Sequence, residues 1–212
     1  MIGFDSINNS SWNEELVAKN KQLLEMALVV AINIYNKSLN NTEESDSNNV
    51  VVARQVLSPE DFEVVWGYHV DTKSELVNGR DAYGYAVSVK ESLTTYTNLV
   101  IGFSTRLNAL IIGRTDSEIV GLGDIMVFTP GDYSKASHNW FTDQYTVFDK
   151  SKGGIDAVAT MVSPKRRFTF FVPGQTDLSI TDDRGRDILV YIKQNEAALR
   201  FKEFFKAFAA AK

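Results

Sequence analysis

Histidine and cysteine, two residue types often used in nucleophilic catalysis, are sparse in this 212-residue chain, which has two histidines and no cysteine. His138 lies in a polar stretch from Thr129 to Tyr145, next to Ser137 and close to Asp143. A histidine that is oriented by a carboxylate can activate a serine hydroxyl as a nucleophile. Long polar loops are common places for such sites. These three residues form the candidate catalytic group, and they make a small hydrolase one candidate function.

The alternative for the same stretch is a surface loop that Trp140 and Phe141 hold in place. Serine and aspartate are common residues, and the chain has no G-x-S-x-G motif of the kind that presents a nucleophilic serine. The non-catalytic interpretation is therefore favoured. The other histidine, His69, lies between Tyr68 and Val70 and is interpreted as a structural residue of a strand.

Neither a metal site nor a nucleotide site is indicated by the sequence. The two histidines are far apart, and without cysteine no zinc-ligand spacing exists. The segment "GLGDIM" (residues 121–126) begins like a glycine-rich dinucleotide loop but ends in methionine. It predicts a bend or bulge in a strand. We expect no metal and no cofactor.

The most basic part of the chain provides a candidate anion or partner contact. This group consists of Lys165, Arg166, Arg167, Arg184 and Arg186. Such side chains could contact a phosphate, a lipid headgroup or an acidic protein. The favoured alternative is a charged hairpin tip that keeps edge strands from pairing. Because the whole chain carries a net charge of −5, nucleic-acid binding is not expected.

The N-terminal part has the apolar spacing of a helix, expected within residues 1–38. So broad an apolar face requires cover from the domain or from a partner helix. Its 13-residue apolar stretch is shorter than the ~20 residues that cross a membrane. Residues 39–49 are expected to form a flexible linker, since residues 40–49 contain no apolar side chain. No signal peptide is predicted at the N-terminus.

Residues 50–212 contain a succession of short β-rich runs, separated by Gly, Asn, Asp or Pro. Strands without intervening helices favour antiparallel pairing. The last run, "DILVYIK", is followed by a helix expected at residues 195–211, with Phe201, Phe205 and Phe208 on one face. The predicted fold class is α+β: an antiparallel β-roll or barrel that is closed by a C-terminal amphipathic helix, with an additional N-terminal helix.

The order of elements from Tyr96 to Phe208 resembles the pleckstrin-homology-like domains of bacterial proteins. The segments "FTFFV" and "DILVYIKQNEAALRFKEFF" carry this resemblance. Members of that family are rolled seven-stranded sheets closed by a C-terminal helix, and they usually bind partners without catalysis. The insertion from Thr129 to Tyr145 and the N-terminal helix depart from a compact member.

Together these observations favour a non-catalytic interaction or regulatory module of a bacterial-type cytoplasmic protein. The N-terminal helix is the expected surface for a protein partner or for self-association. Two alternatives remain open: the small hydrolase described above, and a structural component of a virion or secretion machine.

Overall fold

The computed structural model describes residues 9–42, 55–115, 121–129, 133–149, 167–176 and 192–211. Two long helices lie at the ends of this part of the chain, α1 (Asn9–Thr42) and α3 (Asn195–Ala210). A short 3-10 helix, η1, spans Pro59–Asp61. None of the described helices has a stretch both long and apolar enough to cross a membrane.

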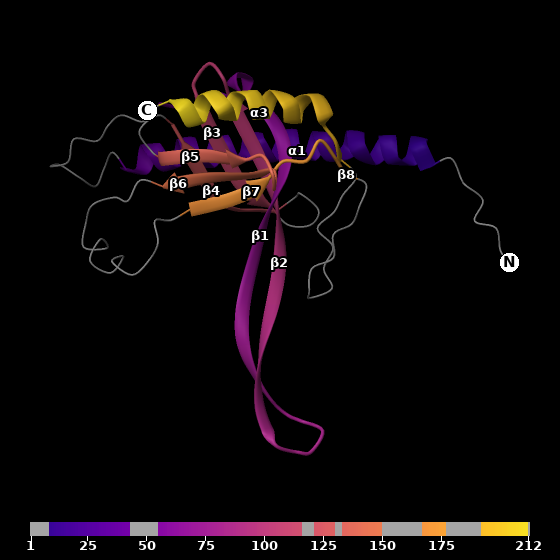
Figure 1. Cartoon of the computed structure of the whole chain (residues 1–212). Helices are drawn as coiled ribbons and strands as arrows, with labels where there is room; N and C mark the ends of the chain where they lie inside the picture. Colours follow the sequence, from indigo (N-terminus) through magenta and orange to yellow (C-terminus); the bar gives the residue numbers. More distant parts are fainter. Residues whose placement is uncertain are drawn as a thin grey trace.

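Seven strands form one antiparallel sheet with the order β4-β3-β2-β1-β7-β6-β5 (Figure 1). Their bounds are β1 Glu63–Arg80, β2 Ala86–Ser104, β3 Ala109–Thr115, β4 Leu122–Phe128, β5 Tyr133–Asn139, β6 Gln144–Asp149 and β7 Arg167–Phe171. A separate two-stranded sheet pairs β8 (Gln175–Thr176) with β9 (Ile192–Lys193) just before α3.

Helix α3 covers one face of the sheet with its phenylalanine side chains. Four of them are buried in a core with alternate residues of the strands: Phe201, Phe204, Phe205 and Phe208. On β2 these partners are Leu99, Ile101 and Phe103. Because successive strand residues point to opposite faces, this spacing places every second β2 side chain under α3. The sequence prediction of a phenylalanine face that packs on a sheet is confirmed.

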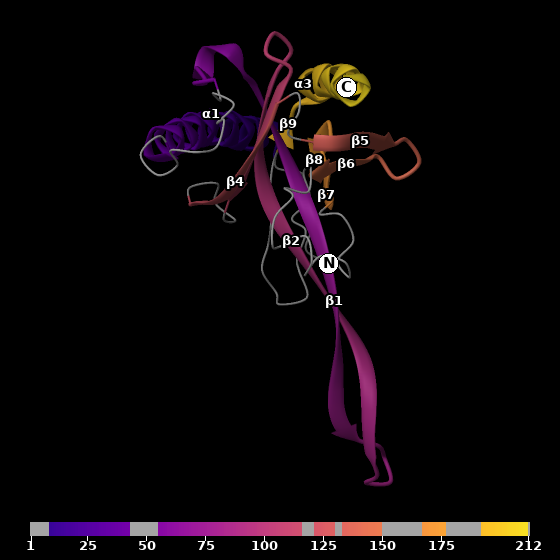
Figure 2. The ribbon, with the colours of Figure 1, turned by 90° about the vertical axis from the view of Figure 1, so that its left-hand side faces the viewer.

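Helix α1 covers the opposite face, as Figure 2 shows. The intervening strand residues Trp66, Val100 and Ile111 pack there. Gly102 permits a close approach, since a Cβ atom at this position would lie 2.4 Å from Cδ1 of Leu28. The α1 side chains buried in this core are Leu24, Ala27, Leu28, Ala31, Ile32 and Tyr35.

The α+β class is confirmed, but the seven-stranded sheet does not close into a barrel, so the barrel that was one form of the expected fold is corrected to an unclosed sheet. The physical reason is burial on both faces. The central strands β1–β3 carry apolar side chains toward α1 as well as toward α3. A barrel would enclose one face, whereas this sheet needs a helix on each.

The expected linker lies mostly outside the described residues. Helix α1 ends at Thr42, and residues 43–54 are not described. The chain is described again from Gln55. Soon after this point the backbone of Leu57 is held by the side chain of Asn36 on α1, through hydrogen bonds of 2.8 and 2.9 Å. The start of the β-rich part is therefore attached to the C-terminal half of α1.

Candidate functional site

The β5–β6 hairpin brings two of the three candidate catalytic residues into contact. Nε2 of His138 lies 2.7 Å from Oδ1 of Asp143. Since a carboxylate only accepts, the imidazole donates this hydrogen bond. Asp143 ends the turn between the strands with a φ of 56°, a conformation that aspartate adopts more readily than most residues. The turn of the hairpin thus orients His138.

The third candidate, Ser137, lies on the other face of the same strand. The register pairs Ser137 with Thr146 and His138 with Tyr145. Neighbouring residues of a strand point in opposite directions, so the Ser137 hydroxyl and the His138 imidazole do not face each other. The structure therefore brings His138 and Asp143 together without the serine that a nucleophilic mechanism would use.

The ring below His138 belongs to the aromatic core. His138 stacks on Tyr145 with ring centroids 4.3 Å apart. Tyr145 in turn contacts Phe201 and Phe205 edge-on. Burial raises the pKa of the Tyr145 phenol well above its ordinary value, and the negative charge of Asp143 adds to the rise. This phenol stays protonated at neutral pH, so it cannot act there as a base.

The turn that follows His138 presents two aromatic side chains to solvent. Trp140 and Phe141 stack on each other at 3.8 Å, and both rings are exposed. Oδ1 of Asn139 accepts a hydrogen bond from the backbone N–H of Phe141 at 3.0 Å, which stabilises the turn. From the sequence, these two rings were expected to hold the loop in place. Their exposure shows that they do not pack into the core.

The remaining candidates are the basic residues of the expected anion or partner contact and the other histidine. Lys165, Arg166, Arg184 and Arg186 lie outside the described residues, and Arg167 begins β7. His69 lies on β1, as predicted, where its ring stacks on Phe168 and its Nδ1 lies 2.6 Å from the carbonyl oxygen of Thr169. Among the residues that the structure describes, no three His, Cys, Asp or Glu side chains gather as metal ligands would.

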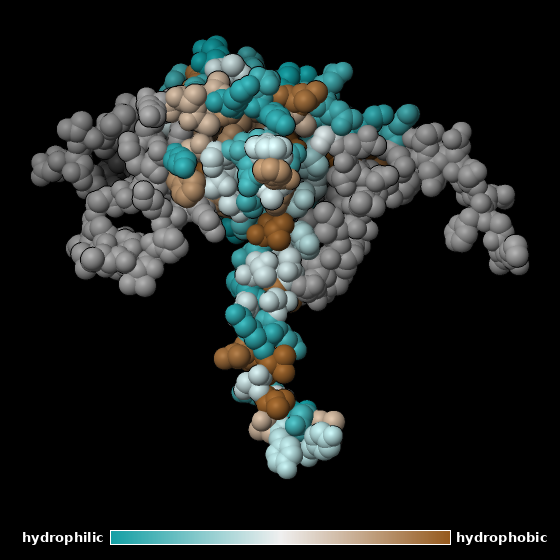
Figure 3. All heavy atoms as spheres, viewed as in Figure 1, coloured by the Kyte–Doolittle hydropathy of each residue, from teal (hydrophilic) through white to brown (hydrophobic). Residues whose placement is uncertain are grey.

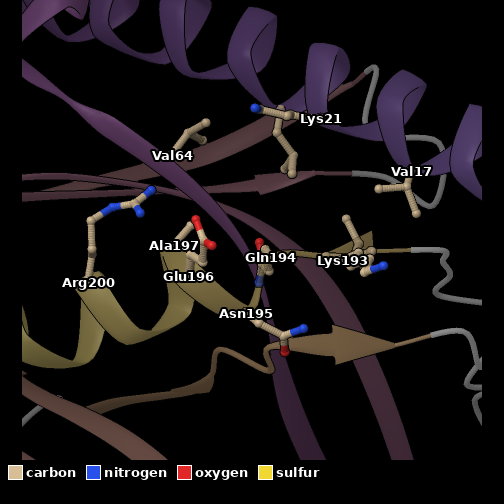
Figure 4. A pocket seen from close by; sticks show the side chains of 11 residues that line it. Val17, Lys21, Val64, Lys193, Gln194, Asn195, Glu196, Ala197 and Arg200 are labelled. Atoms are coloured by element: carbon tan, nitrogen blue, oxygen red, sulfur yellow. The ribbon is translucent and has the colours of Figure 1, made fainter.

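A pocket of about 430 Å³ lies between α1 and the start of α3 (Figure 4). Its lining includes Lys21 from α1 and Glu196 and Arg200 from α3. Nε of Arg200 donates to Oε1 of Glu63 at 2.6 Å, so this cation is already paired. The other lining residues are Val17, Leu24, Val64, Ile192, Lys193, Gln194, Asn195 and Ala197. This mixed lining contains no histidine, serine or threonine that could supply a base with a nucleophile.

The described strands also form an exposed two-stranded arm, which was not predicted from the sequence. Strands β1 and β2 pair from Glu63 with Phe103 to Arg80 with Ala86. The other strands stay close to the body, since β3 pairs with β2 only as far as Asn98 and β7 pairs with β1 at Tyr68. Beyond Tyr68 of β1 and Asn98 of β2, no third described strand pairs with either of these two strands. Residues 71–95, here called the arm, project away from both helices (Figures 1 and 2).

The tip of the arm is a well-defined turn. Oδ1 of Asp81 accepts hydrogen bonds from the backbone N–H groups of Tyr83 and Tyr85, each at 2.9 Å. Gly84 adopts a φ of 85°, which favours glycine. The two tyrosines are 87% and 71% exposed. Asp81 and Gly84, between two runs of strand-forming residues, were the available sequence signal for this hairpin.

Apolar side chains are exposed along the arm as well as at its tip. They appear as separate brown groups on the projecting strands in Figure 3. The largest exposures there belong to Leu76, Val77 and Val89. Exposed apolar groups that gather on one element commonly mark an interaction surface. The arm is therefore the strongest candidate for a docking element.

In comparisons with family models, curated proteins and solved structures, the chain has no match. The class is thus defined by its own architecture: an α+β protein with an open, seven-stranded antiparallel sheet between two helices.

Proposed function

We propose that the protein is a non-catalytic interaction module that docks on a protein partner through its arm. The observation that carries this proposal is the arm itself, ten cross-strand pairs long from Asp71 to Arg80 with no third described strand beside it. An isolated two-stranded hairpin is at best marginally stable in water. Exposed valines, leucine and tyrosines on such a ribbon gain stability when a partner buries them.

The fold supports a binding role more than a catalytic one. An antiparallel sheet with a C-terminal helix packed on it resembles the pleckstrin-homology-like domains, whose members usually bind partners without catalysis. We retain the cytoplasm as the proposed compartment, and the acidic net charge argues against nucleic acid as the partner. A structural component of a virion or secretion machine is one form that this role could take, because projecting hairpins suit assembly.

The test is an arm-shortened variant. Residues 72–94 are replaced by Asn-Gly between Asp71 and Thr95, which are cross-strand partners. This dipeptide favours the tight turn of a two-residue hairpin. We expect the variant to fold with a nearly unchanged melting temperature, since the arm contributes nothing to either core. Affinity capture with mass spectrometry and light scattering should show the loss of partner or self-association. Unchanged association would reject the proposal.

A small hydrolase remains the second candidate, because His138 and Asp143 do form the hydrogen bond that a general base needs. We expect no turnover of ester, phosphate or glycoside substrates by the wild-type protein. If turnover is found, His138→Ala should reduce it by ~10²–10⁴-fold. His69→Ala, at the other histidine, is the matched control. Turnover that depends on His138 alone would favour the hydrolase.

A further inference from the structure

We infer that the partner of the arm is a second copy of this chain, and that the arm lies across the outward face of that copy's α1. This inference rests on the proposed function, since it names the partner of the same arm. It is carried by two unpartnered apolar surfaces on one chain, by their opposite charges and by their similar lengths.

One face of the arm combines valines with a pair of carboxylates. Val77 lies opposite Val89 across the two strands, and Glu75 lies opposite Glu91. All four side chains are on the same face, because directly paired residues and residues two apart along a strand share a face. We call them the valine face. Val87 and Leu93 extend it in both directions.

The two carboxylates need a cation from elsewhere. Like charges directly opposite each other destabilise a strand pair. In the described part of the chain, neither Glu75 nor Glu91 has an ion-pair partner. Lys73, on the same face, lies 4.0 Å from Asp71. A partner that presents lysine or arginine beside an apolar strip would relieve this repulsion and bury the valines together.

Helix α1 presents such a strip on the side away from the sheet. Met26, Val29, Val30 and Ile34 are exposed, with Met26 at 65% and Val30 at 47%. Lys19 and Lys37 are also exposed, seven residues before Met26 and seven after Val30. Seven residues are close to two helical turns, so these lysines lie on the same stripe, one at each end. Together with Glu15, Gln22 and Asn33, which the same spacing places on this stripe, these six residues form the outward face of α1, on which two lysines outnumber one glutamate.

The dimensions of the two surfaces agree. Ten residues of strand, from Asp71 to Arg80, extend ~33 Å at ~3.3 Å per residue. The nineteen residues from Lys19 to Lys37 extend ~28 Å at ~1.5 Å per residue of helix. An arm that lies along α1 can therefore place its carboxylates near a lysine while its valines contact the apolar centre of the helix.

The arm cannot reach α1 of its own copy in this way. It continues the direction of β1 and β2 away from the body, and α1 turns its outward face away from the sheet (Figure 2). A second copy can receive the arm and return its own. Because the contact joins two different surfaces, it closes into a reciprocal dimer or continues as a chain of copies.

Charge reversal on each surface tests this arrangement. One variant carries Glu75→Lys and Glu91→Lys on the arm, and the other carries Lys19→Glu and Lys37→Glu on α1. Each alone should weaken self-association about tenfold or more, since like charges then meet. Mixing the two in equal amounts should restore it, because both arm–helix contacts in the mixed pair join opposite charges. Light scattering across a concentration series measures the mass.

The control is Lys202→Glu with Lys206→Glu, which reverses two exposed lysines of α3 and should leave association unchanged. A monomeric wild type at all concentrations, or a mixture that fails to associate, would overturn the inference. The arm-shortened variant separates the two proposals. If the wild type is monomeric but loses another protein partner when the arm is shortened, the proposed function stands and the second copy is rejected. If shortening changes nothing, both are rejected.

Discussion

Gln194 shows how a single side chain can take the place of a strand. Trp66 donates its backbone N–H to Oε1 of Gln194 at 2.8 Å, and Nε2 of Gln194 donates to the carbonyl oxygens of Trp66 and Pro173, each at 2.8 Å. The amide thus pairs with both backbone groups of Trp66 as a neighbouring strand would. It also fixes the start of α3 against β1.

Replacing Gln194 should lower the free energy of unfolding substantially, although this side chain is polar and only half-buried. Gln194→Ala leaves the backbone N–H and carbonyl of Trp66, in the central strand, without these partners. Unpaired buried groups cost about 1–3 kcal/mol each, so we expect a loss of about 2–4 kcal/mol in the free energy of unfolding. Gln22→Ala, at an exposed glutamine of α1, should change it by less than about 0.5 kcal/mol. Urea unfolding of both variants measures the difference, and similar small losses would contradict the role of Gln194.

Tyr145 predicts how stability depends on alkaline pH. Its pKa is raised in the folded protein, by burial first and by Asp143 second. Below the unfolded pKa, near 10, both states keep the proton and stability is constant. Above it the unfolded chain releases the proton first, so stability falls as pH rises toward the folded pKa. Tyr145→Phe should therefore reduce the alkaline loss, by up to ~1.4 kcal/mol per pH unit. Tyr83→Phe, at an exposed tyrosine, is the control in the same urea titrations, and an equal effect there would contradict the prediction.

At the scale of elements, α3 is attached to the sheet through rings that contact one another as well as the strands. Phe205 is fully buried and lies within 6.2 Å, between ring centroids, of Tyr145, Phe170 and Phe208. Its removal would leave a cavity lined by rigid aromatic side chains, which cannot easily collapse to fill it.

Phe205→Ala should accordingly cost about 3–5 kcal/mol of stability. Leu199 on the same helix is exposed, and Leu199→Ala should cost less than about 1 kcal/mol. Chemical denaturation followed by circular dichroism measures both. If the two variants lost equal stability, α3 would not pack on the sheet through its phenylalanine face.

The helices could be predicted from sequence because their apolar spacing is a local property, as Phe201, Phe205 and Phe208 show. Whether the sheet closes could not be predicted from the sequence. The alternation of apolar and polar side chains along a strand defines two faces, but it does not say which element covers each face. The run "NLVIGF" on β2 is apolar at successive positions, and this continuous pattern fits burial on both faces. The pattern predicts a strand, but it does not say which element covers the second face.

The candidate site was partly predictable for a related reason. His138 and Asp143 meet because a short hairpin brings together residues that are close in sequence. Ser137 was a candidate only because it precedes His138 in the sequence. Neighbouring residues of a strand point to opposite faces, so this closeness in sequence does not bring the two side chains together. The arm was missed because its length depends on where the turn at Asp81 begins, and its polar residues gave no strong alternation.

For the molecule as a whole, the two helices are attached to the sheet in different ways. Helix α3 continues directly from β9, whereas α1 is followed by residues 43–54, which lie outside the described part. The buried face of α1 and the hydrogen bonds between Asn36 and Leu57 nevertheless bind it to the body. We therefore expect α1 to remain bound when the intervening chain is cut.

A glutamate-specific protease should cut first at Glu43 or Glu44, because residues 40–49 have no apolar side chain to bury. The two fragments should then co-elute in size-exclusion chromatography, since six buried side chains hold α1 to the sheet. Gly102→Ala places a methyl group against Leu28 and should make the fragments separate, whereas Gly79→Ala on the arm meets no neighbour and should not. A first cut elsewhere would show that α1 and the body are not joined by an accessible segment. Separation of the wild-type fragments would show that the contact with the sheet depends on the covalent connection.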